Sequence, residues 1–367
     1  MNSIERIEER QSLQILGTYP RQWESMLDPI ALTRRLVDIE SITGNEMPVS
    51  IVLEEILREL AEPFGGVVER IPVEPNRDNL FCYFGQSLVT LSTHQDTVPP
   101  FIPSSEDDDF IWGRGACDVK GIIAAMLCAG EKLLLEGKRN FGFLFVVGEE
   151  RNSVGAYHAG RNPRGSQFII NGEPTENRLS LGSKGALRLE LTAKGKMAHS
   201  AYPELGESAI EKLLDAMEKV RKIHLPVHEI LGPSTMNIGL ISGGRAPNVI
   251  PDAAKAELLI RLVEDGDSTV AAIREACGHT VEVTEVLRIP PVLLGGMDGF
   301  DTMVASYTTD IPAFQGAWGQ PYLLGPGTIH VAHTSEERIP KKQLLDAVGI
   351  YQQMVRTLLE RCHPVLK

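Results

Sequence analysis

The sequence has little of what secreted, membrane-spanning or nucleic-acid-binding proteins need. Its 367 residues include only five cysteines, an odd number without a CxxC pair, so neither a disulfide framework nor a cysteine zinc site is expected. No run approaches 18 consecutive apolar residues, and we therefore expect no membrane partner. Positive charge is also scarce: 36 Lys and Arg against 49 Asp and Glu give a net charge of −13, which argues against nucleic acid as a partner.

The amino-terminal stretch MNSIERIEERQSLQIL has scattered charges and lacks the apolar core and cleavage site of a secretory signal peptide. A reducing compartment is the simplest environment for cysteines without a pairing pattern. We therefore expect a cytoplasmic protein. Hydrophobic residues make up 43% and charged residues 23% of the chain, which is typical of a folded globular protein, and the length is enough for two domains.

The first half of the chain alternates between strand and helix patterns. Short apolar runs predict buried strands at 87–94, 141–148 and 167–171, and helical patterns at 121–137 and 152–160 lie between them. This alternation predicts an α/β domain with a mostly parallel sheet and helices on both faces.

The pattern changes near residue 183. ALRLELTAKGK alternates as a strand does, SAIEKLLDAMEKVRKI is an amphipathic helix, and two further strand patterns precede a second helix, STVAAIREACG. Two strand-helix-strand halves of this size predict a ferredoxin-like α+β unit. We expect an α/β body formed by residues 1–182 and 291–367, interrupted by an α+β module of residues 183–290.

Acidic side chains and a histidine follow the three predicted strands of the body. His94 and Asp96 come after the first strand, Glu149 and Glu150 after the second, and Glu173 after the third. Ligands of open parallel sheets bind beyond the carboxyl ends of the strands, so these side chains are expected to lie together. Carboxylates crowded in a water-poor cleft repel one another, and one or two divalent cations would relieve that repulsion.

A further acid, Asp118, lies in the glycine-rich string WGRGACDVKG just before a predicted helix. A phosphate-binding loop is excluded there, because no lysine is followed by Ser or Thr at the required spacing. Taken singly, the other motifs have ordinary explanations: a strand-end histidine with a solvated acid, or a charged turn. Their coincidence at one sheet edge favours a metal site.

Seven strings resemble, in order, the motifs of the di-zinc metallohydrolases that include acetylornithine deacetylase and succinyl-diaminopimelate desuccinylase, with aminoacylase and zinc carboxypeptidase relatives. They extend from about residue 90 to 337 and are STHQDTVP, GRGACDVKG, VVGEERNSVGA, NGEPT, KGKMAHSAYP, APNVIPDAAKAELLIRL and GPGTIHVAHTSEE. The resemblance implies a zinc exopeptidase-like catalytic domain whose inserted module serves as a dimerisation or lid domain, and hence a homodimer.

The resemblance also implies a ligand set. The residues implied are His94, Asp118 and Glu173 for one zinc and Asp118, Glu150 and His333 for the other. Asp118 would bridge the two ions, Asp96 would stand behind His94, and Glu149 would be the general base. The motif selects His333 and leaves His330 as a bystander. Two Zn²⁺ are expected, although Co²⁺ or Mn²⁺ would also suit a shell of nitrogen and oxygen ligands.

Five residues of the module region match further functional positions of these relatives. His199 would reach the active site of the partner subunit, and Tyr202 would lie near it at the dimer interface. Asn248 and Arg261 would hold the carboxylate or backbone of the substrate, and a guanidinium suits a carboxylate because it binds bidentately. Lys184 stands where relatives often use a basic residue. Alone, His199 would be read as an ordinary surface histidine.

The expected function is a metal-dependent amidohydrolase similar to acetylornithine deacetylase. It would remove an acyl group, acetyl first, from an N-acyl amino acid, using a metal-bridging hydroxide and Glu149. Alternatives are a succinyl-diaminopimelate desuccinylase, a zinc carboxypeptidase or dipeptidase, and, outside enzymes, an inactive dimeric binding protein. Two departures bear on specificity. The stretch with SSEDDD between His94 and Asp118 is shorter than in most of these relatives. The acid after the third strand is Glu173 and not an aspartate, and a glutamate there accompanies deacylases and carboxypeptidases in the family.

Overall fold

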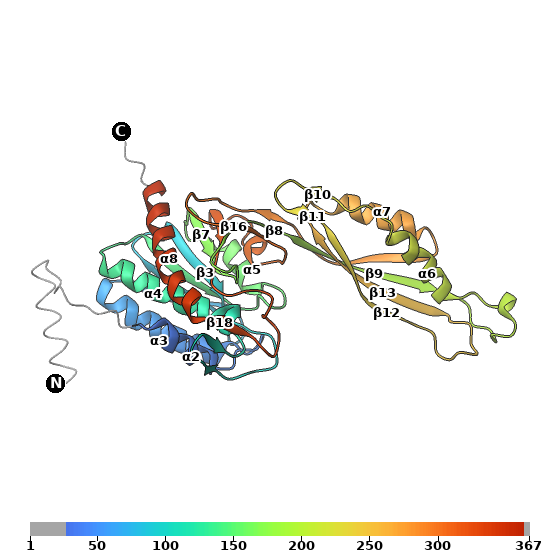
Figure 1. The fold of residues 1–367 in the computed structure, drawn as a ribbon, viewed down its shortest axis with the longest axis horizontal. Helices are drawn as coiled ribbons and strands as arrows, with labels where there is room; N and C mark the ends of the chain where they lie inside the picture. The colour runs from blue at the N-terminus through green and yellow to red at the C-terminus, as the bar shows by residue number, and fades with distance from the viewer. Residues whose placement is uncertain (1–26, 363–367) are drawn as a thin grey trace, which may run out of the picture.

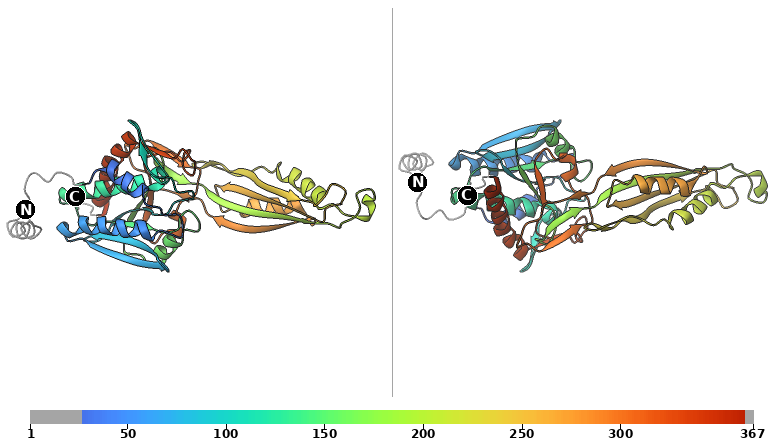
Figure 2. Two further views of the ribbon diagram at one scale, coloured as in Figure 1. Left: turned by 90° about the horizontal axis from the view of Figure 1, so that it is seen from below. Right: turned by 90° about the horizontal axis from the view of Figure 1, so that it is seen from above.

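The computed structural model describes residues 27–362, and the stretch assessed for a signal peptide lies outside them. Figure 1 shows an elongated molecule in which an α/β body, containing both ends of the described chain, carries a narrower module that extends away from it. The two further views in Figure 2 show the same extension. None of the described helices is both long enough and apolar enough to cross a membrane.

The body is built on a six-stranded sheet. Its strands, in spatial order, are β1 (Val67–Glu74), β2 (Arg77–Phe84), β6 (Phe141–Val146), β3 (Val89–His94), β7 (Phe168–Asn171) and β17 (Gln320–Leu323). The last four run parallel to one another, whereas β1 and β2 form an antiparallel pair at one edge. The predicted α/β fold is therefore confirmed, and β1 and β2 are an addition that the sequence patterns did not show.

Helices cover both faces of this sheet because its strands are apolar on both faces. In β6, Phe143 packs into the core with the helices of one face, whereas Leu144 packs against α5 on the other. Such two-sided burial is typical of parallel strands in α/β proteins. The helices of the body are α2 (Pro29–Val37), α3 (Met47–Ala61), α4 (Gly121–Leu135), α5 (Val154–Arg161) and α8 (Lys341–Cys362), with short helical turns η1 (Glu62–Phe64), η2 (Ala116–Lys120) and η4 (Ile311–Phe314).

Two small sheets complete the body. They consist of β15 (Val292–Leu293), β8 (Leu179–Ser183) and β16 (Thr302–Ala305), and of β18 (Arg338–Pro340), β5 (Phe110–Trp112) and β4 (Ser105–Glu106). The pairing of β18 with β5 brings the chain before α8 beside the chain before η2. Two segments more than 200 residues apart in sequence are thereby placed side by side.

The module is a four-stranded antiparallel sheet with two helices on one face. Its elements are β9 (Gly185–Lys194), η3 (Pro203–Leu205), α6 (Ala209–Val220), β10 (Val227–His228), β11 (Gly232–Pro233), β12 (Thr235–Gly243), β13 (Ala253–Leu262), α7 (Asp267–Cys277) and β14 (Val281–Ile289). The sheet order is β12-β13-β9-β14. Alternate residues of β13 are buried, and Leu258 packs in one apolar cluster with Leu213 of α6 and Ile273 of α7. This is the predicted α+β arrangement.

The strand register fixes which end of the module is far from the body. Lys194, at the end of β9, pairs with Ala253 at the start of β13, whereas Gly185 pairs with Leu262 near the body. The connecting segments 195–208 and 244–252 therefore lie together at the far end, where Figures 1 and 2 show the yellow-green loop.

Candidate metal centre

The carboxyl end of β3 supplies an imidazole whose tautomer is fixed by the backbone. Nδ1 of His94 donates a hydrogen bond to the carbonyl of Asp96 at 2.9 Å. Nε2 is left facing the carboxylates, 3.2 Å from Oδ1 of Asp118 and 4.0 Å from Oε2 of Glu149. An imidazole held in this way through one nitrogen presents the lone pair of the other to a metal.

A second imidazole meets the same carboxylate from the other side. Nε2 of His333 lies 3.2 Å from Oδ2 of Asp118 and 3.0 Å from the carboxylate of Glu150. Each oxygen of Asp118 thus faces a different histidine, as a carboxylate that bridges two ions would do. Ligand atoms of His94, Asp118 and Glu150 all lie within 4.8 Å of one another, close enough to hold a metal ion.

The carboxylates of the cluster are costly to ionise together, and bound cations would stabilise their charged forms. Burial raises the pKa of Glu149 and of Glu173 well above the usual range, with repulsion from neighbouring carboxylates adding to the effect, and it also raises the pKa of Glu150. Burial would raise the pKa of Asp118 too, but its hydrogen bonds with His333 and His94 outweigh it and lower that pKa. The hydrogen bond to Asp118 is the main reason that the pKa of His333 is raised to about 10.

Glu173 completes the donor set at the end of β7. Its side chain is buried, its Oε1 lacks a hydrogen-bond partner within the described chain, and Asp118 and His94 are its strongest charged neighbours. A buried carboxylate oxygen without a partner is costly, and a divalent cation would supply the missing contact. The predicted ligand residues therefore fit a metal centre with mixed nitrogen and oxygen donors.

Asp96 lies behind His94, as the resemblance implied, and its carboxylate also holds a second segment. Its carboxylate lies 3.6 Å from Nδ1 of His94, too long for a strong hydrogen bond, and accepts instead from the backbone N–H groups of Gly148, Glu149 and Glu150 at 2.9, 3.1 and 3.3 Å. The hydroxyl of Thr43 donates to it at 2.8 Å. Asp96 therefore orients His94 through its backbone carbonyl and holds the Glu149 loop through its side chain.

Two residues near the cluster, the buried Asp310 and the half-buried Tyr307, were missed by sequence reasoning. Asp310 precedes η4, both its carboxylate oxygens lack partners among residues 27–362, and burial raises its pKa to about 7. The hydroxyl of Tyr307 donates to the carbonyl of Pro174 at 2.9 Å, next to Glu173. No strand or helix pattern surrounds either residue, so the sequence offered no signal beyond the residue types themselves.

The three predicted residues at the far end of the module are not brought to the cluster by their own chain. His199 and Tyr202 lie in segment 195–208, with ring centroids 6.3 Å apart. Asn248 joins them through its carbonyl, which accepts from the backbone of Ser200 at 3.0 Å. All three belong to one distal site, separated from the body by the length of the module.

The other two predicted residues lie nearer the body. Arg261 pairs in register with Ala186 at the body end of β13; burial lowers its pKa, and no ion pair or hydrogen bond to its guanidinium is seen in the described part of the chain. Lys184 stands at the junction, where its Nζ donates to the carbonyl of Pro233 at 2.7 Å. That contact ties the side chain of Lys184 to the β11 segment.

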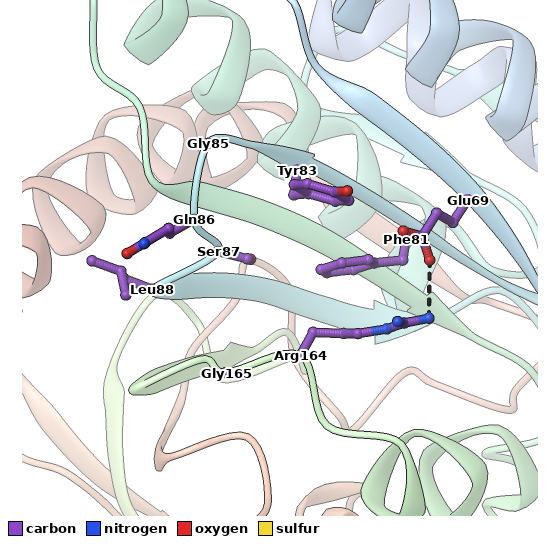
Figure 3. A pocket seen from close by; sticks show the side chains of 9 residues that line it. All are labelled: Glu69, Phe81, Tyr83, Gly85, Gln86, Ser87, Leu88, Arg164 and Gly165. Atoms are coloured by element: carbon purple, nitrogen blue, oxygen red, sulfur yellow. Dashed lines mark hydrogen bonds and ion pairs between the residues drawn. The ribbon is translucent and has the colours of Figure 1, made fainter.

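A cavity of about 400 Å³ opens at the amino ends of the parallel strands, opposite the metal cluster at their carboxyl ends (Figure 3). Its walls include the stacked rings of Phe81 and Tyr83, 5.2 Å apart, and the ion pair of Arg164 with Glu69, at 2.9 Å. The segment 85–88 that lines it precedes β3, whereas His94 ends that strand. None of the predicted site residues lines this cavity.

A mostly parallel sheet whose carboxyl edge carries two imidazoles and several carboxylates, with His94, Asp118 and Glu173 buried, is the arrangement of a metal-dependent hydrolase. The profile of the peptidase dimerisation domain matches residues 181–285. A peptidase M20 domain-containing protein of Schizosaccharomyces pombe is 41% identical over 339 residues, covering 89% of this chain and 84% of that protein. The chain belongs to the M20 peptidase family.

A second relative agrees with this assignment, and a solved structure shows the same fold. A probable carboxypeptidase of Aspergillus niger is 35% identical over 376 residues, covering 90% of each chain. The crystal structure of aminopeptidase PepT from Bacillus cereus has the same fold, with a TM-score of 0.77, 21% identity and coverage of 90% of this chain and 98% of that chain. The protein is an enzyme, so the alternative of an inactive binding protein is not retained.

Proposed function

We propose that the protein hydrolyses an amide bond next to a free α-carboxylate, using two divalent cations held around Asp118. The observation that carries this proposal is the placement of Asp118 between His94 and His333, with Glu149 beside the same cluster. His94 and Glu173 would complete one ion site, and Glu150 and His333 the other. Bound ions would supply Lewis acidity, lowering the pKa of a water molecule and stabilising the negative charge that develops in the transition state.

Glu149 supplies the proton transfers that amide hydrolysis requires. Its pKa is raised by burial, so the carboxylate is a stronger base than an ordinary glutamate. In the proposed reaction Glu149 accepts a proton from the attacking water and passes it to the nitrogen of the departing amine. An amine leaves readily only when protonated, which explains the need for a proton carrier at this place.

Arg261 is our candidate for the group that binds the carboxylate of the substrate. Arg188, on β9 of the same sheet, is neutralised by Glu257 at 2.5 Å, whereas the partly buried Arg261 lacks such a partner in residues 27–362. A guanidinium without a counterion binds a carboxylate strongly and bidentately. The name of the Aspergillus niger relative, a probable carboxypeptidase, supports a substrate with a free carboxylate.

Two substrate classes satisfy this chemistry. Removal of an acetyl group from an N-acyl amino acid, as in acetylornithine deacetylase, is our first proposal, with zinc as the expected metal and the cytoplasm as the expected compartment. Cleavage of a carboxy-terminal residue from a peptide is the second, favoured by the names of the fungal relatives. The two reactions differ in the group on the acyl side of the scissile bond.

A substrate panel together with an Arg261 variant tests the proposal. Acetyl, succinyl and glutamyl amino acids and short peptides would be assayed by released amine, each with a free carboxylate and as its amide. The wild type should cleave the free acids, and Arg261→Met should lower kcat/KM for them by about 10- to 100-fold, since a hydrogen bond to a charged group is lost. The acyl group that is cleaved fastest separates a deacylase from a carboxypeptidase.

Arg188→Met is the matched control, because it removes an arginine from a neighbouring strand of the same sheet whose charge is already paired. It should leave kcat/KM for the free acids within about two-fold of wild type, as surface ion pairs contribute little. An Arg261→Met enzyme that still prefers the acid to the amide as strongly as wild type would remove Arg261 from substrate recognition.

We also propose a homodimer formed through the module. β12 is an edge strand whose side chains are exposed, and apolar Leu240 and Ile241 lie on it, at 62% and 58% exposure. Ile241 lines a groove together with Leu214 of the adjacent helix α6. An exposed apolar edge strand favours pairing with another chain. In such a dimer, His199 at the far end of one module would be placed over the metal cluster of its partner.

Mixing two inactive variants tests the shared site. His199→Ala and Glu149→Ala homodimers should each be nearly inactive, and subunit exchange between them should restore about a quarter of wild-type activity, because half of random dimers are mixed and each has one complete site. Released amine before and after exchange is the measurement. Mixing two separately prepared His199→Ala samples is the control. Mixed dimers that gain no activity would place the whole site within one chain.

A further inference from the structure

Glu337 lies where two distant parts of the metal cluster meet. It follows His333 by four residues and precedes β18, whose pairing with β5 places it beside the loop that ends in Asp118. The side chain is 0% exposed, although a glutamate is among the residues least often buried. The backbone adds a further link, since the N–H of Gly113 donates to the carbonyl of Glu337 at 3.0 Å.

The Glu337 carboxylate forms hydrogen bonds and an ion pair with groups of this loop. Its Oε1 accepts hydrogen bonds from the backbone N–H groups of Gly115, Cys117 and Asp118 at 2.8, 3.3 and 3.1 Å. Its Oε2 forms a buried ion pair with Arg114. Four donors around one carboxylate compensate for its burial, and hydrogen bonds to an ionised acceptor are among the stronger ones in proteins.

The position of Asp118 in the loop 113–118 depends on contacts with the rest of the chain. Gly113 and Gly115 have φ values of 136° and 87°, a left-handed region that favours glycine, and Asp118 has non-helical backbone angles within the short turn η2, so no long regular element fixes this segment. Asp118 must nevertheless present one oxygen to His94 and the other to His333, and the ligands of a metal tolerate little displacement. Asp118 and Glu337 are 219 residues apart, so noncovalent contacts alone hold them together.

We infer that Glu337 is a positioning residue that fixes Asp118 between the two histidines and ties the His333 segment to the Asp118 loop. The inference rests on the proposed role of Asp118 and His333 as metal ligands. Glu337 itself binds neither metal nor substrate. It acts by holding the backbone N–H of Asp118 and of two preceding residues, and through them the direction of the Asp118 carboxylate.

Metal affinity tests this role without substrate. Glu337→Gln loses the charge that holds Arg114 and weakens the acceptor for the three N–H groups, and we expect it to bind Co²⁺ about 10- to 100-fold more weakly, the usual effect of removing a group that orients a metal ligand. The dissociation constant would be measured by titration of the metal-free full-length chain. Amide hydrogen exchange of residues 113–120, without metal, should be faster than in wild type.

Glu54→Gln is the matched control, because Glu54 is also an ion-paired glutamate, bonded to Arg58 and Arg70, but its contacts lie on α3 and β1. It should leave both the Co²⁺ affinity and the exchange of residues 113–120 unchanged. A Glu337→Gln protein that binds Co²⁺ within two-fold of wild type would overturn the inference, whatever its thermal stability.

Glu337→Asp is the second variant. Its shorter side chain retains the charge but is too short to reach all four donors, and it should also weaken Co²⁺ binding. If both variants fail to fold under conditions in which Glu54→Gln folds, Glu337 is a folding determinant and the positioning role is wrong. If the wild type itself binds no Co²⁺, the metal centre of the proposed function is wrong. In that case amide exchange of residues 113–120 tests the positioning role separately: exchange in the Glu337 variants that is slower than or equal to that of the wild type would overturn it.

Discussion

Glu149→Ala is expected to lower kcat by about 10²- to 10⁴-fold, the usual contribution of a positioned general base, while two metal ions per chain are retained. The reason is the position of Glu149 beside the cluster: its Oε2 lies 4.0 Å from Nε2 of His94, whereas the nearer contacts of the histidines go to Asp118 and Glu150. Removal of Glu149 therefore takes away the proton carrier and leaves the ligand set intact. Released amine and elemental metal analysis are the two measurements.

The pH dependence of the same pair of proteins adds a second readout. Glu149 must be deprotonated to accept a proton, and its pKa is raised by burial above the usual value of about 4.3. Wild-type kcat/KM should therefore fall as the pH is lowered through the pKa of Glu149. In Glu149→Ala this acidic limb should be absent from the residual activity.

Glu55→Ala is the control for Glu149→Ala, since Glu55 is an exposed glutamate on α3. It should have wild-type kcat, metal content and pH profile. Turnover close to wild type in Glu149→Ala would assign the proton transfers to another group. Loss of metal in Glu149→Ala would instead make Glu149 a ligand, and the division of roles between Glu149 and Glu150 would have to be reversed.

Much of the body could be predicted because its strands are buried on both faces. The run FGFLFVVG became β6, and the acids that follow it lie at the sheet edge where parallel strands end together. The same reasoning failed for β1 and β2, because VVERIPVE and RDNLFCYF mix charged and apolar residues without a clear period of two. β1, at the sheet edge, is at most half-buried, and in β2 only residues 80–84 are apolar and pack on both faces, so neither strand gave a clear pattern.

The roles of individual side chains were harder to predict than their positions. Asp96 lies behind His94 as expected, but its carboxylate also accepts hydrogen bonds from the backbone N–H groups of residues 148–150, which was not expected. Which N–H groups a carboxylate binds depends on the direction in which the neighbouring backbone N–H groups point, and a pattern of residue types does not show that direction. Glu337 stood within a motif string and received no role for the same reason, since its donors come from a loop more than 200 residues earlier.

The location of His199 shows a different limit. The motif KGKMAHSAYP identified the residue, but only the register of β9 with β13 shows that it lies at the far end of the module. A histidine there cannot serve the cluster of its own chain while the module extends away from the body (Figure 2). The homodimer is therefore the simplest arrangement in which this residue and the metal cluster meet, which makes the subunit-exchange experiment decisive for it.

Asp118→Ala should have the largest effect on the metal centre, because one carboxylate contacts both histidines. Oδ1 lies 3.2 Å from His94 and Oδ2 lies 3.2 Å from His333. Its loss removes the group proposed to bridge the two ions, so both sites lose a ligand at once. We expect metal affinity to fall by more than the roughly 10- to 100-fold typical of an outer-shell partner, and amidase activity to fall with it.

Thermal unfolding separates this effect from a general loss of stability. A ligand present at about 100 times its dissociation constant adds about 2.7 kcal/mol to the free energy of unfolding. Wild-type Tm should therefore rise when Zn²⁺ is added to the metal-free protein, whereas Asp118→Ala should show little or no rise. Asp108→Ala, which removes an exposed acid from the SSEDDD stretch, should behave as wild type. An Asp118→Ala chain that retains two ions and the full rise in Tm would show that the ions are held without a bridge, and the proposed arrangement around Asp118 would be wrong.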